Sequence, residues 1–167
     1  ITGGPFTLPS VPIVYVAGTC MSSGKTSAAC RLIRQLARRG IAVGGAKLTG
    51  VALRRDVLQM CDHGARWAAS FTDAGVVSTD PTNAAQVART LLQHLVQTGA
   101  EVIVAELGDG ILGAYGVQEI LGAADLAAAA TVIVLCANDP VGAWGAREVL
   151  RERFGVSIDV IAGPISD

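Results

Sequence analysis

Apolar and polar residues follow two different periods along this chain, and the two kinds of segment alternate. Short segments of apolar and small residues have the composition of strands buried on both faces, and they lie at residues 13–17, 41–47, 102–106, 131–136 and 157–162. Longer segments with an apolar residue every three or four positions predict helices with one buried face, at residues 24–39, 53–69, 80–98, 116–124 and 142–154. A further short strand is predicted at residues 74–78. This alternation predicts an α/β fold, a mostly parallel sheet with helices on both faces.

Two of the predicted helices have recognisable ends. The first stops before Gly40, and Arg38 and Arg39 suit the negative end of its dipole. The third begins at Asp80 and Pro81, where aspartate is a common cap and proline is favoured at the first helical position. These residues support the predicted boundaries of both helices.

The first twelve residues differ in composition from the rest of the chain. They contain three of the six prolines and two adjacent glycines, which predicts an extended linker over residues 1–12. Residues 13–167 then form one domain, a length that suits a single hydrophobic core. Because the first residue is Ile1 and not methionine, we expect a fragment of a longer protein with a further N-terminal domain.

Composition and charge exclude several classes of partner. With 13 Lys and Arg against 14 Asp and Glu, the net charge is −1, so neither nucleic acid nor an anionic membrane is expected to bind. No apolar run reaches the roughly 18 residues that a membrane span needs. The four cysteines lie far apart and form no C-x-x-C pair, which indicates reduced thiols in a cytoplasmic protein.

The most informative motif lies between the first strand and the first helix. Residues 18–26 read Gly-Thr-Cys-Met-Ser-Ser-Gly-Lys-Thr, a phosphate-binding loop in the strand–loop–helix context that it requires. Main-chain N–H groups of such a loop converge on phosphate oxygens, the lysine reaches the β- and γ-phosphates, and the threonine hydroxyl ligates Mg²⁺. Five residues, and not the usual four, separate the two glycines. The predicted nucleotide-binding residues are Gly18, Thr19, Ser22, Ser23, Gly24, Lys25, Thr26 and Ser27.

Polar residues at the ends of the other predicted strands complete a candidate site, because ligands collect at the carboxyl ends of parallel strands. Thr26, Asp56 and Glu106 supply the hard oxygen ligands that Mg²⁺ requires, and Lys47 is a candidate clamp for phosphate or substrate. Plainer alternatives remain for three of these residues. Asp56 is equally explained as a helix cap or an ion-pair partner of Arg54, and Lys47 as a surface lysine. For Glu106 the alternative is a solvated charge at the end of the strand.

Four other residues have weaker functional interpretations. Cys20 is explained as a small loop residue, and Asp109 as a second carboxylate or a turn residue. His63 beside Asp62 could form an acid–base pair, although its position on the helix is uncertain. Trp144 could stack on a base or lie in a dimer contact, but we expect it to pack in the core.

Together these motifs resemble dethiobiotin synthetase, of the P-loop class that includes the signal-recognition and MinD-type proteins. That family's loop reads Gly-Thr-Asp-Thr-x-Val-Gly-Lys-Thr, its Lys-Pro-Val resembles residues 47–49, and its Glu-Gly-Ala-Gly-Gly resembles residues 106–110. The resemblance implies a homodimer that uses ATP, in which Thr26, Asp56 and Glu106 hold Mg²⁺. Lys25 and Lys47 would then be catalytic and stabilise phosphate and carbamate-phosphate charge.

The chain departs from this family at four places. Cys20 replaces the loop aspartate, Leu48 replaces the proline, and the insertion between Lys47 and Asp56 is short. Residues 163–164 occupy the region of the asparagine that reads the base. The loop is also similar to that of a little-characterised bacterial family whose P-loop domain follows another N-terminal domain. The sequence therefore predicts a Mg²⁺-dependent ATP-binding ligase that transfers phosphoryl to a small carboxylate or carbamate. The alternative is a nucleotide-hydrolysing regulatory module that acts through an adjoining domain or partner protein.

Overall fold

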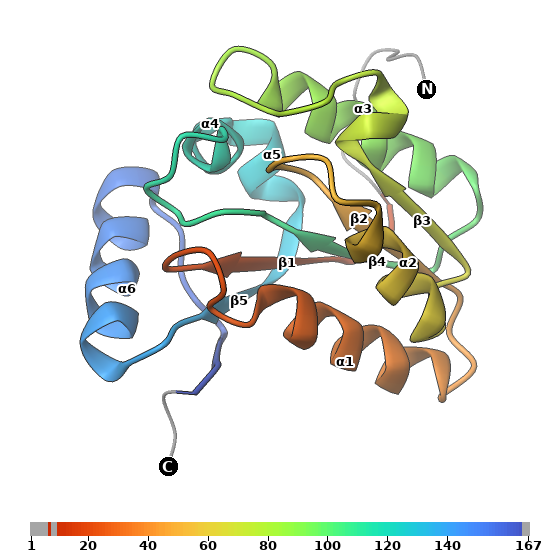
Figure 1. The fold of residues 1–167 in the computed structure, drawn as a ribbon, viewed down its shortest axis with the longest axis horizontal. Helices are drawn as coiled ribbons and strands as arrows, with labels where there is room; N and C mark the ends of the chain where they lie inside the picture. The colour runs from red at the N-terminus through yellow and green to blue at the C-terminus, as the bar shows by residue number, and fades with distance from the viewer. Residues whose placement is uncertain (1–6, 8–9, 165–167) are drawn as a thin grey trace.

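The computed structural model describes residue 7 and residues 10–164, so most of the predicted linker lies outside the described residues. Six parallel strands form one sheet in the order β3-β2-β4-β1-β5-β6 (Figure 1). The strands are β1 (Ile13–Gly18), β2 (Val43–Lys47), β3 (Trp67–Ser70), β4 (Val102–Glu106), β5 (Ala130–Cys136) and β6 (Val160–Ala162). This arrangement confirms the predicted α/β fold.

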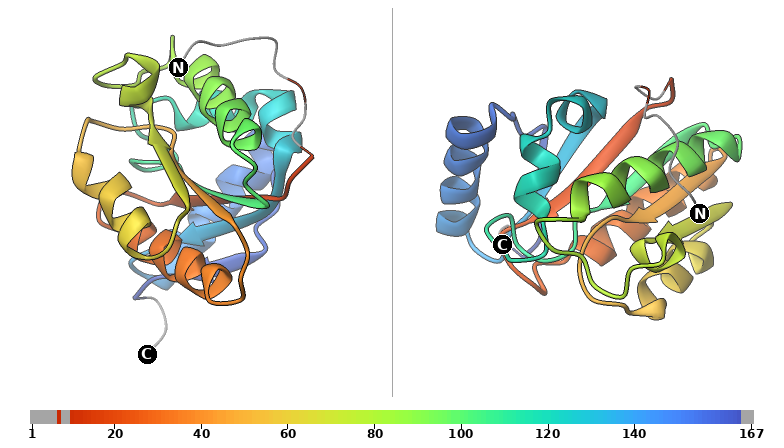
Figure 2. Two further views of the ribbon diagram at one scale, coloured as in Figure 1. Left: turned by 90° about the vertical axis from the view of Figure 1, so that its right-hand side faces the viewer. Right: turned by 90° about the horizontal axis from the view of Figure 1, so that it is seen from above.

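Helices cover both faces of the sheet, in three layers (Figure 2). One face packs against α1 (Lys25–Ala37) and α2 (Arg54–Asp62), and the other against α3 (Ala84–Gln97), α4 (Val117–Gly122), α5 (Ala124–Ala129) and α6 (Pro140–Phe154). A short 3-10 helix, η1 (Phe71–Ala74), follows β3. None of the helices among the described residues is long and apolar enough to cross a membrane.

The central strand β1 shows why its sequence is apolar throughout. Ile13, Tyr15 and Ala17 contribute to the core beneath α3 to α6, whereas Val16 contributes to the core beneath α1 and α2. Alternate side chains of a strand point to opposite faces, so a strand covered on both sides needs apolar residues at every position. The Tyr15 hydroxyl donates a hydrogen bond to the Leu126 carbonyl at 3.0 Å, and burial raises the pKa of this phenol.

The predicted helix over residues 53–69 is wrong in its second half. The helix α2 ends at Asp62, Gly64 follows with φ of 102°, and Trp67–Ser70 form the edge strand β3 beside β2. Alanines at positions 65, 68 and 69 favour a helix locally, but Ala68 and Ala69 pair with β2 and cover its open edge. Pairing with β2, which is distant in the sequence, therefore outweighs the helix propensity of this segment.

Three smaller predictions about secondary structure are also corrected. The predicted strand over residues 74–78 is reduced to a single antiparallel bridge between Val51 and Ser78. The third helix begins at Ala84, because the Asp80 carboxylate accepts hydrogen bonds from Thr82 and forms a separate turn. The predicted helix over residues 116–124 is followed by a second helix, α5, that the sequence reading missed.

Candidate functional site

The phosphate loop has the tight backbone that its glycines predict. The strand β1 ends at Gly18, where a Cβ atom would overlap Ser23 Oγ and lie 2.9 Å from Lys25 Cδ. Gly24, the residue before α1, has φ of 91°, and Ser22 has φ of 61°. The loop therefore needs glycine at position 18 for space and at position 24 for backbone conformation.

Lys25 is held against the loop with only 5% of its surface exposed. Its Nζ donates to the Cys20 carbonyl at 2.7 Å and lies 3.5 Å from Ser23 Oγ. Burial lowers the pKa of Lys25, and the negative charge of Glu106 opposes that shift. These contacts with the loop fix the position of the Lys25 ammonium.

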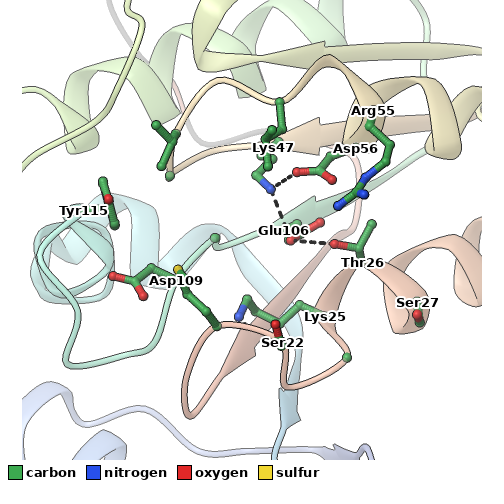
Figure 3. A pocket seen from close by; sticks show the side chains of 16 residues that line it. Ser22, Lys25, Thr26, Ser27, Lys47, Arg55, Asp56, Glu106, Asp109 and Tyr115 are labelled. Atoms are coloured by element: carbon green, nitrogen blue, oxygen red, sulfur yellow. Dashed lines mark hydrogen bonds and ion pairs between the residues drawn. The ribbon is translucent and has the colours of Figure 1, made fainter.

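Sheet register brings Lys47 and Glu106 together at the loop. Residues Lys47, Glu106 and Val16 are cross-strand partners on β2, β4 and β1. Thr26 Oγ1 donates to Glu106 Oε1 at 3.0 Å, Lys47 Nζ lies 3.6 Å from the same oxygen, and Lys47 forms an ion pair with Asp56 (Figure 3). The proposed ligands Thr26, Asp56 and Glu106 therefore lie in one connected network, with Asp56 paired to the lysine.

The second carboxylate oxygen of Glu106 has no partner. Glu106 is 2% exposed, and its Oε2 is the one buried side-chain polar atom among the described residues without a hydrogen bond. Burial raises the pKa of Glu106, with the Lys47 charge opposing the shift. An unpaired buried carboxylate oxygen beside the Thr26 hydroxyl fits a hard divalent cation. In the described part of the chain, no group of three or more His, Cys, Asp and Glu side chains forms a metal cluster, so phosphate and water would have to supply the remaining ligands.

A cavity of about 390 Å³ lies between the phosphate loop and the ends of β2 and β4. Of the predicted residues, it is lined by Ser22, Gly24, Lys25, Thr26, Ser27, Lys47, Asp56 and Glu106. The other three predicted residues, Gly18, Thr19 and Ser23, do not line it. Ser23 is buried within the loop, and the Thr19 amide donates to the Cys136 carbonyl at 2.9 Å.

Three further residues line the cavity, and for two of them, Arg55 and Tyr115, the sequence predicts no role. Arg55 extends from the first turn of α2 toward the side of the cavity where Thr26 and Glu106 lie (Figure 3). Tyr115 and Asp109 line the cavity from the loop after β4, with the Asp109 carboxylate turned toward its own loop (Figure 3). Asp109 has φ of 74°. The position of Arg55 beside Asp56 is a signal that could have been used, but the start of α2 had to be known first.

Three loops at the mouth of the cavity are joined by hydrogen bonds of two buried threonines. Thr49 Oγ1 donates to the Gly108 carbonyl at 2.8 Å, which joins the ends of β2 and β4. The Thr79 hydroxyl accepts from the Gly50 amide and donates to the Tyr115 carbonyl, both at 2.8 Å. These bonds hold the cavity-lining segments in fixed relative positions.

We expect Gly108→Ala to destabilise the protein by about 1–3 kcal/mol, because a Cβ at this position would overlap the Thr49 carbonyl and press on Lys47. The measurement is the free energy of unfolding from denaturant titration. Gly145→Ala on α6 is the matched control. Nothing lies within 4 Å of a Cβ there, so it should stabilise the helix by about 0.5–1 kcal/mol. Equal effects of the two substitutions would contradict the close contact at Gly108.

Other residues noted in the sequence lie outside this cavity. Trp144 is 65% exposed on α6, so the prediction that it packs in the core is wrong. Asp139 caps α6 through the Gly142 amide at 2.8 Å. His63 lies at the far end of α2, where its Nδ1 is 2.8 Å from the Gln59 carbonyl, and so it does not reach the cavity.

No protein-family model and no curated protein sequence matches the chain. Several solved protein structures are similar to this chain. The signal recognition particle 54 kDa protein of Aeropyrum pernix K1, solved with GDP, has a TM-score of 0.61 at 22% identity, over 92% of this chain and 35% of that one. The receptor FtsY of Elizabethkingia anophelis has a TM-score of 0.58 at 18% identity, over 89% of this chain and 48% of that one.

A third similar structure is the kinase domain of the Escherichia coli tyrosine kinase ETK, with a TM-score of 0.60 at 15% identity, over 93% of this chain and 68% of that one. The chain has the P-loop NTPase fold. It spans about a third of the length of the first structure and about half of the second. None of the three is a dethiobiotin synthetase, so the resemblance to that family remains a prediction.

Proposed function

We propose that this domain binds a nucleoside triphosphate with Mg²⁺ and cleaves or transfers its terminal phosphoryl group. The observation that supports this most directly is the pairing of an unsatisfied buried oxygen, Glu106 Oε2, with the Thr26 hydroxyl at the end of a phosphate loop. Thr26 and Glu106 would hold the metal ion. When bound, Mg²⁺ would neutralise charge on the phosphate oxygens.

The residues of the chain would act chiefly by position and charge. Lys25, held at the loop by its hydrogen bond to the Cys20 carbonyl, and the loop amides would stabilise negative charge that develops on the phosphoryl group. Lys47 approaches from β2, where Asp56 and Glu106 keep its ammonium inside the cavity. In this proposal Asp56 orients Lys47 and contributes to the charge around the metal without being its principal ligand.

The identity of the nucleobase needs its own test, because no side chain among the described cavity residues selects the nucleobase by itself. One similar protein was solved with GDP, while the motif resemblance favours ATP. The direct test is titration calorimetry with ATP and GTP, each with and without Mg²⁺, followed by phosphate release. We expect Mg²⁺-dependent binding of at least one nucleotide with affinity in the range of about 1 μM to 1 mM. The absence of binding heat with both nucleotides would refute the proposal.

A second candidate is transfer of the phosphoryl group to a small carboxylate or carbamate, as in the dethiobiotin synthetase-like prediction. In its favour, Lys47, Arg55 and Tyr115 line the part of the cavity beyond the phosphate loop, next to the expected position of the terminal phosphate. Phosphate release that rises only when a small acceptor is added would support transfer. Turnover that rises only with a protein partner would instead support the regulatory module.

We expect Arg55→Ala to weaken binding of nucleoside triphosphate by about tenfold while leaving diphosphate affinity within about twofold. Arg55 forms no ion pair with any described residue, and its guanidinium faces the side of the cavity where Thr26 lies, so a terminal phosphate is its nearest prospective partner (Figure 3). Calorimetry with both nucleotides measures the effect.

The matched control for Arg55 is its neighbour. Arg54→Ala removes the same charge from the same helical turn, but Arg54 lines a different depression with Val57 and Leu58. Arg54→Ala should therefore leave both affinities unchanged. If the two variants lose triphosphate affinity equally, Arg55 acts only through general electrostatics.

A further inference from the structure

Charge is strongly segregated along this nearly neutral chain. Residues 25–66 contain nine Lys and Arg against two Asp and Glu, a net charge of +7. Residues 67–167 contain four Lys and Arg against twelve Asp and Glu, a net charge of −8. The overall balance therefore hides a basic region that comprises α1, β2 and α2.

The basic residues of this region form an exposed face on α1 and α2. Two lysines are buried in the nucleotide cavity, but five arginines on α1, just after α1 and just before β3 are exposed, namely Arg31, Arg34, Arg38, Arg39 and Arg66. Residues 31, 34 and 38 follow helical spacing, so they form one stripe along α1. Within the described residues, none of the five lies within ion-pair distance of a carboxylate.

Arginines elsewhere in the same fold do find acidic partners. Arg89 donates to Asp125 through two nitrogens, at 2.7 and 2.9 Å, and Arg151 pairs with Glu148. On α1 the helix dipole favours cations at the C-terminal end, which covers Arg34 and Arg38 but not Arg31. Like charges four residues apart, such as Arg34 and Arg38, destabilise a helix by about 0.2–0.5 kcal/mol. The dipole therefore explains only part of the stripe, and no carboxylate of the described residues pairs with it.

A groove lies at the end of this stripe. Its cavity volume is about 560 Å³, with Arg34, Ala37 and Arg38 on one wall and Asp62, His63 and Gly64 on the other. The helices α1 and α2 lie side by side there (Figure 2). A Cβ on Gly64 would lie only 2.9 Å from the Ala37 Cβ, so the floor is close-packed and the charged groups form the rim.

We propose that this basic groove, the groove lined by Arg34, Arg38 and His63, binds an acidic segment of a partner protein. Arginine pairs with carboxylates through two parallel hydrogen bonds, which favours acidic side chains. Of the exposed large apolar residues in the described chain, only Leu58 lies on α1 or α2. The aromatic residue beside this face, Trp67, is partly buried, and the Arg66 guanidinium lies over its ring, 4.9 Å from the centroid. The face thus offers few apolar side chains for insertion into a bilayer and no uncovered aromatic platform for single-stranded nucleic acid.

The spacing of the arginines specifies the acidic segment further. Arg34 and Arg38 are four residues apart on a helix, a rise of about 6 Å. Alternate side chains of an extended peptide are about 6.6–6.8 Å apart on one face. A segment with acidic residues at every second position therefore matches both arginines. Asp62 on the opposite wall repels any anion. An alternating segment can turn its acidic side chains to the arginines and its uncharged side chains to Asp62, whereas a phosphate backbone carries a charge at every unit.

The test is fluorescence polarisation with a labelled peptide of alternating Glu and Ser, at about 50 and 300 mM salt. We expect the wild-type protein to bind at low salt and to lose affinity at high salt, and a Gln-Ser peptide not to bind. The double variant Arg34→Ala/Arg38→Ala should weaken binding by more than about tenfold. Nucleotide binding should not change, because neither arginine lines the nucleotide cavity.

The matched control is Arg147→Ala/Arg153→Ala, which removes two exposed arginines of α6 that also lack an ion pair. It should leave peptide affinity within about twofold. Equal losses in the two double variants would overturn the proposal, because binding would then depend on net charge alone. Failure of wild-type protein to bind the peptide, or tighter binding to duplex RNA or phosphatidylserine vesicles than to the peptide, would also overturn it.

Discussion

Replacing Lys25 by alanine is expected to lower the rate of nucleoside triphosphate cleavage by about 10²- to 10³-fold. The ammonium lies over the phosphate loop, where hydrogen bonds to the Cys20 carbonyl and Ser23 hold it in place. Charge moves onto the phosphoryl oxygens during the reaction, so a cation already in position stabilises the transition state more than the bound substrate. Single-turnover phosphate release with saturating nucleotide measures this loss.

The fold should survive this substitution. Lys25 is buried with a lowered pKa, so its removal also relieves an unfavourable desolvation of charge. Circular dichroism and the midpoint of thermal unfolding should therefore remain close to wild type. Arg54→Ala, which removes a cation outside the cavity, should retain full turnover. Full turnover by Lys25→Ala would refute the proposed mechanism.

Replacing Glu106 by glutamine is expected to abolish stabilisation of the protein by Mg²⁺ and to lower turnover by about 10²- to 10³-fold. Glutamine keeps the size of the side chain and can still accept the hydrogen bond from Thr26, but it removes the negative charge and the free carboxylate oxygen. The decisive measurement needs no catalysis. The thermal midpoint of wild-type protein with nucleotide should rise with Mg²⁺, and that of the variant should not.

The pH dependence of the metal-free protein provides a second measurement on Glu106. Burial raises the pKa of Glu106, so the folded state binds its proton more tightly than the unfolded state. This tighter proton binding adds to the free energy of unfolding in full at pH values below the ordinary carboxyl pKa. The added stability is lost as the pH rises through the raised pKa that Glu106 has in the folded protein. Glu106→Gln should flatten that part of the stability profile. Glu152→Gln, on the exposed surface of α6, should leave both the pH profile and the Mg²⁺ effect unchanged.

If Glu106→Gln retained the full Mg²⁺-dependent rise in thermal midpoint, Glu106 would not be a metal ligand. We expect the Glu106→Gln variant to keep its affinity for nucleotide, since Lys25 and the loop amides are unchanged. The two substitutions therefore separate the phosphate loop from the metal site.

Much of the candidate site could be predicted because its residues lie beside local signals. The loop from Gly18 to Thr26 is contiguous, so its strand, glycines and helix are all visible in one segment. The sequence indicates Lys47 and Glu106 because each closes a strand, and parallel strands end at the same edge. It leaves the role of Asp56 open, and in the structure Asp56 forms an ion pair with Lys47 and not with Arg54.

Two residues that line the cavity are identified only in three dimensions. Arg55 lies in the first turn of α2 and Tyr115 in the loop after β4, and their directions depend on where α2 begins and how that loop turns. The groove beside α1 is a similar case. Its arginines are visible in the sequence, but their lack of acidic neighbours depends on which surfaces the fold brings together.

The sequence by itself determined the α/β class, most of the strands and helices, and the phosphate loop. Each of these depends on burial pattern or on contacts within a few residues, which a local segment encodes. Only the tertiary structure decided the strand order, the edge strand β3 and the meeting of Thr26, Lys47 and Glu106 at one oxygen. These features depend on pairing between residues far apart in the chain, where packing and register outweigh local propensity.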